Sequence, residues 1–166
     1  MLFRTILETL FGSNAATKQR ERNVLFTLAV FATVDEIFRH YHDPIRTSSI
    51  QSFFSYYEST GATEFPNEYR HLEFALDELL KLYINRVETF NKSMRVILND
   101  DKAAFERLNA EVKTITNNII KLCQKEIKHI PKELEQRVNQ VKWHLLKQPT
   151  ILDLLANEIN SNPINN

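Results

Sequence analysis

The apolar residues of this chain recur at steps of three and four positions, a spacing that places them on one face of an α-helix. The two longest stripes lie in the middle of the sequence. The first consists of Tyr69, Glu73, Leu76, Leu80, Tyr83, Val87, Phe90, Met94 and Ile97. The second consists of Phe105, Leu108, Val112, Ile115, Ile119, Leu122, Glu126 and His129. Between them stand Asn99, Asp100 and Asp101, polar residues that can cap the second helix and suit its positive N-terminal end. We therefore expect a long antiparallel helical hairpin over residues 67–130, with Asn67 capping its first helix.

Helical patterns also flank this hairpin on both sides. The further helices that we expect are 1–12, 15–41, 48–57, 132–148 and 150–159. Residues 24–34 are almost wholly apolar, which suits a central helix that its neighbours cover on most sides. The pattern predicts an all-α fold, a helical bundle of five to six helices. It forms one domain over residues 15–159, followed by a disordered tail at 160–166.

Composition supports the all-α class and excludes several kinds of site. The chain of 166 residues has only two glycines, Gly12 and Gly61, too few for a fold rich in tight β-turns. A glycine-rich phosphate loop, a dinucleotide-binding fingerprint and a nucleophile elbow are excluded for the same reason.

Charge is balanced overall but not along the sequence. The 21 basic and 21 acidic side chains cancel, so we do not expect general binding to nucleic acid or to an anionic membrane surface. Residues 35–101 are nevertheless acidic on balance, and residues 102–147 are basic. Either adjacent helices of opposite charge stabilise each other, which we favour, or the basic region binds an acidic partner.

Cys123 is the single cysteine, so no internal disulfide is expected and a reducing compartment fits best. Its place beside Leu122 predicts a small buried side chain rather than a nucleophile. We find no apolar run long enough for a transmembrane segment and no convincing secretory signal, so the expected location is cytoplasmic.

The polar residues of the two stripes form the first candidate for chemistry. The expected pairing carries His71, Glu73, Glu126 and His129 to the same end of the hairpin. The spacing from Glu126 to His129 matches the glutamate–histidine pairs of di-iron carboxylate bundles, and such ligands suit iron, manganese or zinc. The alternative is that these residues only complement helix ends, as histidines do in a last turn. We favour end-capping and expect no cofactor.

A second candidate is the pair Arg137 and His144 on the expected helix 132–148. Their spacing resembles the arginine–x(4–6)–histidine signature of the all-helical HEPN ribonucleases. The resemblance covers two residues only, and Val138 stands where that family usually has a polar residue. It implies that His144 would act as the acid–base group and that Arg137 would stabilise the charge of the phosphorane.

Neither grouping exceeds chance, and we favour a non-enzymatic function over an enzymatic one. The favoured function is a non-enzymatic protein-protein interaction module, an adaptor, inhibitor or regulator, that binds another protein or a second copy of itself. The metal-binding bundle and the ribonuclease are the alternatives. The side chains that could bind the partner are the six apolar residues of the N-terminal helix and one tryptophan: Leu2, Phe3, Ile6, Leu7, Leu10, Phe11 and Trp143. The alternatives, which we favour for each surface taken alone, are that the N-terminal helix packs on its own domain and that the last helix covers Trp143.

Overall fold

The computed structural model describes residues 16–40 and 65–147, and this part of the chain is almost entirely helical. Its elements are α2 (Ala16–His40), the short 3-10 helix η1 (Asn67–Tyr69), α5 (His71–Leu98), α6 (Lys102–Lys128) and α7 (Lys132–Leu146). It contains four α-helices and no strand, which confirms the all-α class for these residues. The helices expected at 1–12, 48–57 and 150–159, and the tail at 160–166, lie outside the described residues.

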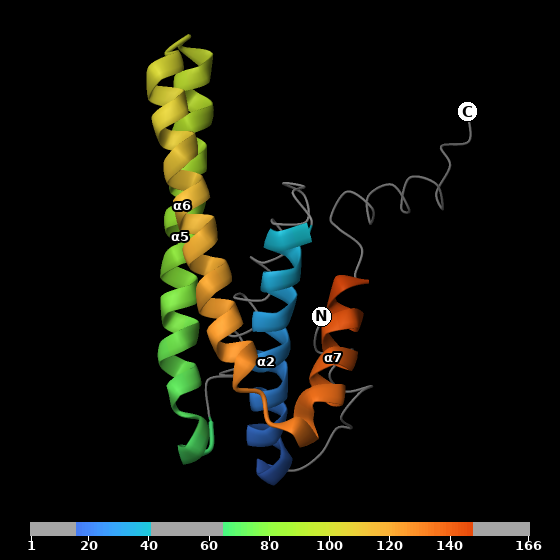
Figure 1. Ribbon diagram of the computed structural model, residues 1–166. Coiled ribbons are helices and arrows are strands. Elements are labelled where there is room, and N and C mark those ends of the chain that lie inside the picture. The colour runs from blue at the N-terminus through green and yellow to red at the C-terminus, as the bar shows by residue number, and fades with distance from the viewer. Residues whose placement is uncertain (1–15, 41–64, 148–166) are drawn as a thin grey trace, which may run out of the picture.

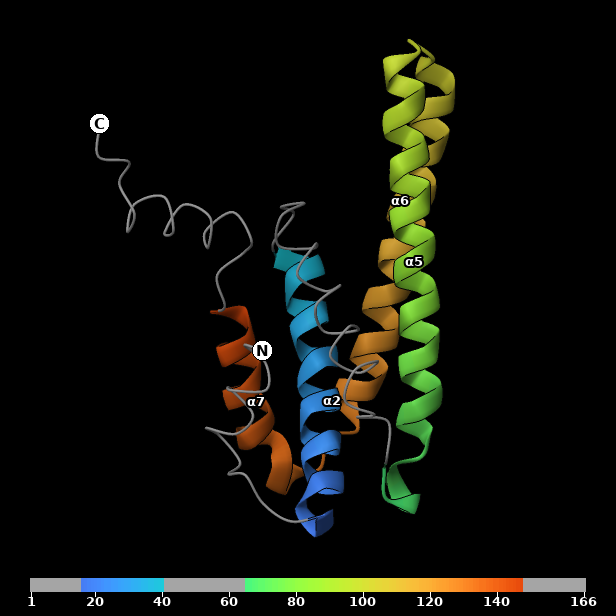
Figure 2. The ribbon, with the colours of Figure 1, turned by 180° about the vertical axis from the view of Figure 1, so that it is seen from behind.

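The helices form three layers. Helices α5 and α6 lie side by side and run in opposite directions, α2 packs against this pair, and α7 packs on the far side of α2 (Figures 1 and 2). The pair is longer than its neighbours: one end of α5 and α6 projects well beyond the ends of α2 and α7 (Figure 1). We call the part beside α2 the proximal half of the pair and the projecting part the distal half.

Helix α2 is the centre of the fold. Every residue from Asn23 to Asp35 is buried, as the apolar run 24–34 predicts. Two polar side chains on this helix find partners within it: Thr33 Oγ1 donates a hydrogen bond to the Ala29 carbonyl at 2.6 Å, and the buried Asp35 accepts from Arg39 one turn later. These bonds allow polar groups to lie in the interior without an unmade hydrogen bond.

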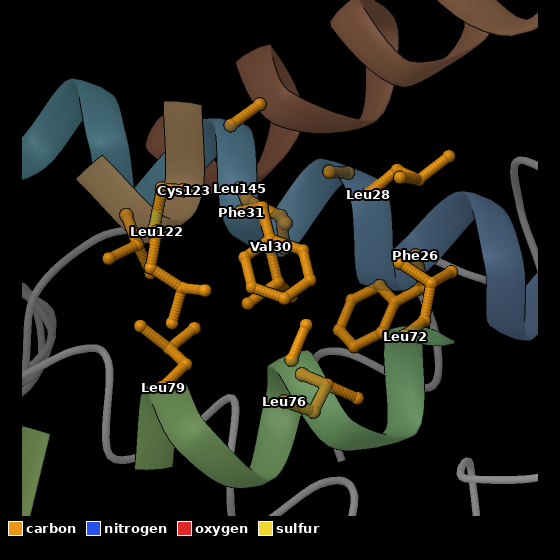
Figure 3. Packing of buried hydrophobic residues seen from close by; sticks show 14 of the residues in the cluster. Phe26, Leu28, Val30, Phe31, Leu72, Leu76, Leu79, Leu122, Cys123 and Leu145 are labelled. Atoms are coloured by element: carbon orange, nitrogen blue, oxygen red, sulfur yellow. The ribbon is translucent and has the colours of Figure 1, made fainter. Parts of the chain in front are cut away.

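All four helices contribute to a single hydrophobic core. Figure 3 shows Leu72, Leu76 and Leu79 of α5 pointing toward Phe26 and Phe31 of α2. The remaining labelled side chains come from α2 itself, α6 and α7: Leu28, Val30, Leu122, Cys123 and Leu145. Cys123 is completely buried, which confirms its predicted role as a small core residue.

The two expected helix caps have different outcomes. The Asp101 side chain accepts a hydrogen bond from the Ala104 N–H at 3.1 Å, and so caps α6 as predicted. The prediction for Asn67 is wrong, because Asn67 is the first residue of η1 and no side chain caps η1 or α5. The bend between η1 and α5 places Arg70, not an asparagine, at the start of α5.

The two apolar stripes also differ in outcome. The interior of the α6 stripe is buried as predicted: Val112, Ile115, Ile119, Leu122 and Glu126. The α5 stripe is correct in its proximal part, where Leu76 and Tyr83 are buried and Tyr69, Leu80 and Val87 are partly buried against the core, apart from the exposed Glu73. It is wrong in its distal part, where Phe90, Met94 and Ile97 are exposed. The other buried residues of α5 are Leu72, Ala75, Leu79, Thr89 and Ser93. The reason is that α5 meets two described helices in its proximal half and only α6 in its distal half, so its buried side changes along its length.

Candidate functional site

The boundary between the two halves of the α5–α6 pair is marked by Arg86. Its guanidinium carbon lies 4.7 Å from the centre of the Phe38 ring in the last turn of α2, and its Nε donates a hydrogen bond to Thr116 Oγ1 of α6 at 2.8 Å. Arg86 therefore fixes the level at which α2 ends. Beyond it α5 continues for twelve residues, about 18 Å of helix, and α6 for fourteen residues, about 21 Å.

This projecting half carries exposed apolar side chains. Phe90 is 37% exposed, Met94 and Ile97 are each 44% exposed, and Leu98 is 84% exposed. We call these four residues the distal face. The prediction that Phe90, Met94 and Ile97 are buried in the contact between α5 and α6 is therefore wrong.

Helical geometry explains which side these residues occupy. Phe90, Met94 and Ile97 each follow a buried residue of the proximal half by 18 positions, which is five full turns of an α-helix. Those buried residues, Leu72, Leu76 and Leu79, are the ones that pack against α2. The apolar stripe of α5 thus continues past the end of α2 without changing its direction, and none of the described helices covers its continuation (Figure 1).

The contact between α5 and α6 in the distal half is made by different residues. Thr89 and Ser93 are buried there, each one position before a residue of the distal face. Ser93 Oγ donates to the Phe90 carbonyl at 2.6 Å, so its hydroxyl is satisfied within α5. Such small side chains, one turn apart, allow two helices to approach closely. Because they face α6, the large residues beside them are left on the surface.

The distal face is bounded by polar groups. The charged residues of this stretch of α5, Glu88, Lys92 and Arg95, fall on the opposite side of the helix by their spacing. At the end of the pair, a cleft of about 400 Å³ lies between Ile97 and Phe105. Its rim includes Asp100, which has a positive φ of 60°, and the capping residue Asp101. We call residues 99–101 the acidic tip.

Of the four candidate metal ligands, the structure brings only two together. His71 Nε2 lies 3.7 Å from Glu126 Oε2, with the histidine exposed and the glutamate buried. Glu73 is two positions after His71 and therefore points to another side of α5, while His129 is exposed at the end of α6. Within residues 16–40 and 65–147, no three histidine, cysteine or carboxylate side chains lie close enough to hold a metal ion.

The two candidate ribonuclease residues are both exposed on α7. Arg137 lines a cleft of about 500 Å³ at the base of α2 and α7, whose rim also includes Glu68 and Glu133. His144 is seven residues later, about 10 Å along the helix, and does not line that cleft. The arrangement thus offers no described pocket in which both side chains could contact one phosphate.

Trp143 is 48% exposed, and the Lys142 ammonium lies 4.6 Å from the centre of its ring. Leu146, which stands one turn later, is buried. The other six predicted partner-binding residues lie outside the described residues: Leu2, Phe3, Ile6, Leu7, Leu10 and Phe11.

Burial and neighbouring groups shift the pKa values of Cys123, Arg86 and Arg39. Desolvation, together with the charges of Asp35 and Glu126, raises the pKa of the Cys123 thiol well above its ordinary range. The thiol therefore stays protonated and unreactive at neutral pH. Burial lowers the pKa of Arg86, and the hydrogen bond to Asp35 raises the pKa of Arg39.

No protein-family model matches the chain, and no curated protein or solved structure is significantly similar to it. In the part of the chain that the structure describes, no helix combines the length and the hydropathy needed to cross a bilayer. The distal face is the feature that sequence reasoning missed. The 18-residue spacing between Leu72, Leu76 and Leu79 and the distal residues Phe90, Met94 and Ile97 shows that both sets lie on the same side of α5. Only the length of α2 relative to α5 decides that the second set is exposed.

Proposed function

We propose that this protein is a non-enzymatic helical module that binds another protein, or a second copy of itself, through the distal face. The observation that carries the proposal is the unbroken apolar stripe of α5. Its proximal part packs against α2, and its distal part, Phe90, Met94 and Ile97 with Leu98 beside them, is exposed. Exposed apolar surface of this kind typically marks a site of protein interaction.

The geometry supports a helix as the bound element. In the proximal half, α2 packs closely against α6, and the leucines of the α5 stripe point toward it. The distal half offers the same side of α5 in the same direction, so it suits an amphipathic helix that packs as α2 does. Recognition by packing needs no catalytic group.

The fold that we propose for the complete chain is a bundle of five to six helices around the antiparallel hairpin of α5 and α6. Support comes from the helical spacing of apolar residues in 48–57 and 150–159, which would add two helices to the four described ones. The N-terminal helix and Trp143 then provide further surface for a partner. We also propose a cytoplasmic location, because the lone Cys123 is a protonated core thiol that suits a reducing compartment.

A photo-crosslinking amino acid tests the proposal. We would place benzoylphenylalanine at Phe90 and, in a matched variant, at Phe74. Phe74 is also on α5 and is 78% exposed, but it lies outside the distal face. Irradiation of cells that express the full chain should give specific covalent adducts from position 90 and few from position 74, because only position 90 lies within the proposed contact.

The mass of the adduct distinguishes the two kinds of partner: twice the mass of the chain indicates a second copy, and any other defined mass indicates a different protein. Equal crosslinking from positions 90 and 74, or no adduct from either, would contradict the proposed function.

A further inference from the structure

We infer that the distal face binds a second copy of this chain, in an antiparallel arrangement that sets the acidic tip of each copy against the end of α2 in the other. This inference rests on the proposed function and names its partner. Three observations lead to it: the reach of the chain's own segments, the distribution of charge along the distal half, and the symmetry of the exposed residues.

The lengths of the segments outside the described residues limit how far this chain can cover its own distal face. Residues 41–64 connect the end of α2 with Phe65, which lies at the opposite end of that helix; α2 is about 36 Å long. The end of α2 lies beside Arg86, where the distal half begins, and we call this level the foot of the distal half. A path from the end of α2 to the acidic tip, and from there to Phe65, is about 72 Å long. Twenty-four residues span at most about 80 Å when fully extended, so two turns of helix make the segment too short.

The other two segments start farther from the distal face or across α2. Residues 1–15 precede the base of α2, and a helix over 1–12 with a short linker does not reach beyond its other end. Residues 148–166 follow α7, on the far side of α2, and are long enough to cross it. Intramolecular cover by this last segment is therefore an outcome that the experiment must identify.

Charge selects the antiparallel orientation. The tip carries Asp100 and Asp101, both exposed, and the adjoining Lys102 and Glu106 line the same cleft and cancel each other, so the tip is acidic on balance. The foot of the distal half carries Arg39 and His40 in the last turn of α2, and Arg86. Asp35, which is paired with Arg39, and Glu36 balance the two arginines, so the foot has no net charge, whereas the tip is acidic.

An antiparallel pair sets the acidic tip of each copy against the foot of the other, which has no net charge, whereas a parallel pair brings the two acidic tips together, where like charges repel. The net charge of zero means that no long-range repulsion opposes self-association.

The exposed residues are self-complementary about Met94, which lies about midway between Arg86 and the tip. With Met94 on the two-fold axis, Met94 meets its own counterpart, and Phe90 of each copy faces Leu98 of the other. A two-fold interface pairs residues reciprocally in this way. The two distal halves then form a four-helix arrangement with an apolar centre.

Single cysteines test both the partner and the orientation. In the full chain with Cys123→Ala, we would introduce Met94→Cys, Leu98→Cys or Phe74→Cys. Mild oxidation should give a covalent dimer from Met94→Cys. Leu98→Cys should give little, because its two copies are about 12 Å apart along the axis, beyond the reach of a disulfide. Phe74→Cys should remain monomeric. If Cys123→Ala reduces the helical signal in circular dichroism, the native Cys123 can be kept, because it is buried.

Light scattering of the uncrosslinked chain provides the second readout. The wild type should show a dimer at high concentration, and Met94→Asp should weaken dimerisation at least about thirtyfold, as expected at the centre of an interface. Phe74→Asp should change it less than about twofold.

A chain that stays monomeric at every concentration overturns the inference, as does crosslinking through Leu98→Cys but not Met94→Cys. If position 90 then crosslinks to a different protein, the proposed function stands without the dimer. If position 90 crosslinks only within its own chain, to residues 148–166, both are wrong.

Discussion

Cys123 and Arg86 show how neighbouring groups set the chemistry of a single side chain. Cys123 lies in the core with the carboxylates of Asp35 and Glu126 near enough to oppose its ionisation, so burial and charge act in the same direction. Arg86 is half-buried and yet charged, because it stacks on Phe38 and donates to Thr116. One residue is thereby kept inert, and the other joins three helices.

The thiol gives the fold a specific dependence on pH. In the unfolded chain Cys123 ionises near pH 8.5, whereas the folded protein retains the proton at higher pH. Because the folded state then binds more protons, its stability is complete below pH 8.5 and falls as the pH rises. We expect the free energy of unfolding of the wild type to fall about 2 kcal/mol more than that of Cys123→Ala between pH 7.5 and 10.

Urea denaturation at the two pH values measures this difference, and tyrosines and lysines common to both proteins cancel in the comparison. Identical pH dependence in the two proteins would show that Cys123 is accessible to solvent.

At the scale of the element, α5 has two different environments along one uninterrupted helix. Its proximal half packs leucines against α2, and its distal half packs Thr89 and Ser93 against α6. The hydrophobic periodicity of the sequence identifies only the side of α5 that faces α2, because the large apolar residues lie on that side. This is why the predicted stripe includes Phe90, Met94 and Ile97 and omits the two small buried residues.

The start of α6 allows a direct test of local capping. Asp101→Ala removes the acceptor for the Ala104 N–H and leaves an unpaired donor at a helix end, so it should lower the free energy of unfolding by about 1 kcal/mol. Lys102→Ala, at the first position of the same helix, should change it by less than about 0.5 kcal/mol. Chemical denaturation of the three proteins checks both values; equal effects of the two substitutions would mean that the cap contributes nothing to stability.

At the scale of the whole molecule, the relative lengths of the helices create the candidate site. Helix α2 has 25 residues and ends beside Arg86, whereas α5 has 28 residues and begins farther along the bundle. The pair α5 and α6 therefore projects beyond its cover (Figure 2). The exposed apolar residues of the distal half do not belong to the described core, so they are available to bind a partner.

Substitutions should separate the distal face from the core. Phe90→Gln with Met94→Gln should change the free energy of unfolding by less than about 1 kcal/mol at low protein concentration, because both side chains are already partly hydrated. Leu79→Ala, at a completely buried position, should lower it by about 2–5 kcal/mol.

Thermal unfolding at low and high concentration measures both effects. Only proteins with an intact distal face should show a Tm that rises with concentration, as mass action requires of a dimer. A large loss of stability from the double glutamine variant at low concentration would place Phe90 and Met94 in the core instead.

The sequence alone determined the helical class, the apolar centre of α2, the buried face of α6, the cap at Asp101 and the burial of Cys123. Each of these depends on a local rule: the 3.6-residue period, the acceptor at a helix start or the preference of a small thiol for the interior. Only the tertiary structure decided that Phe90, Met94 and Ile97 are exposed, that Thr89 and Ser93 are buried, and that Glu73 and His129 do not join His71 and Glu126. The physical reason is that periodicity gives the face on which a side chain lies, whereas its burial depends on whether another helix extends far enough to cover that face.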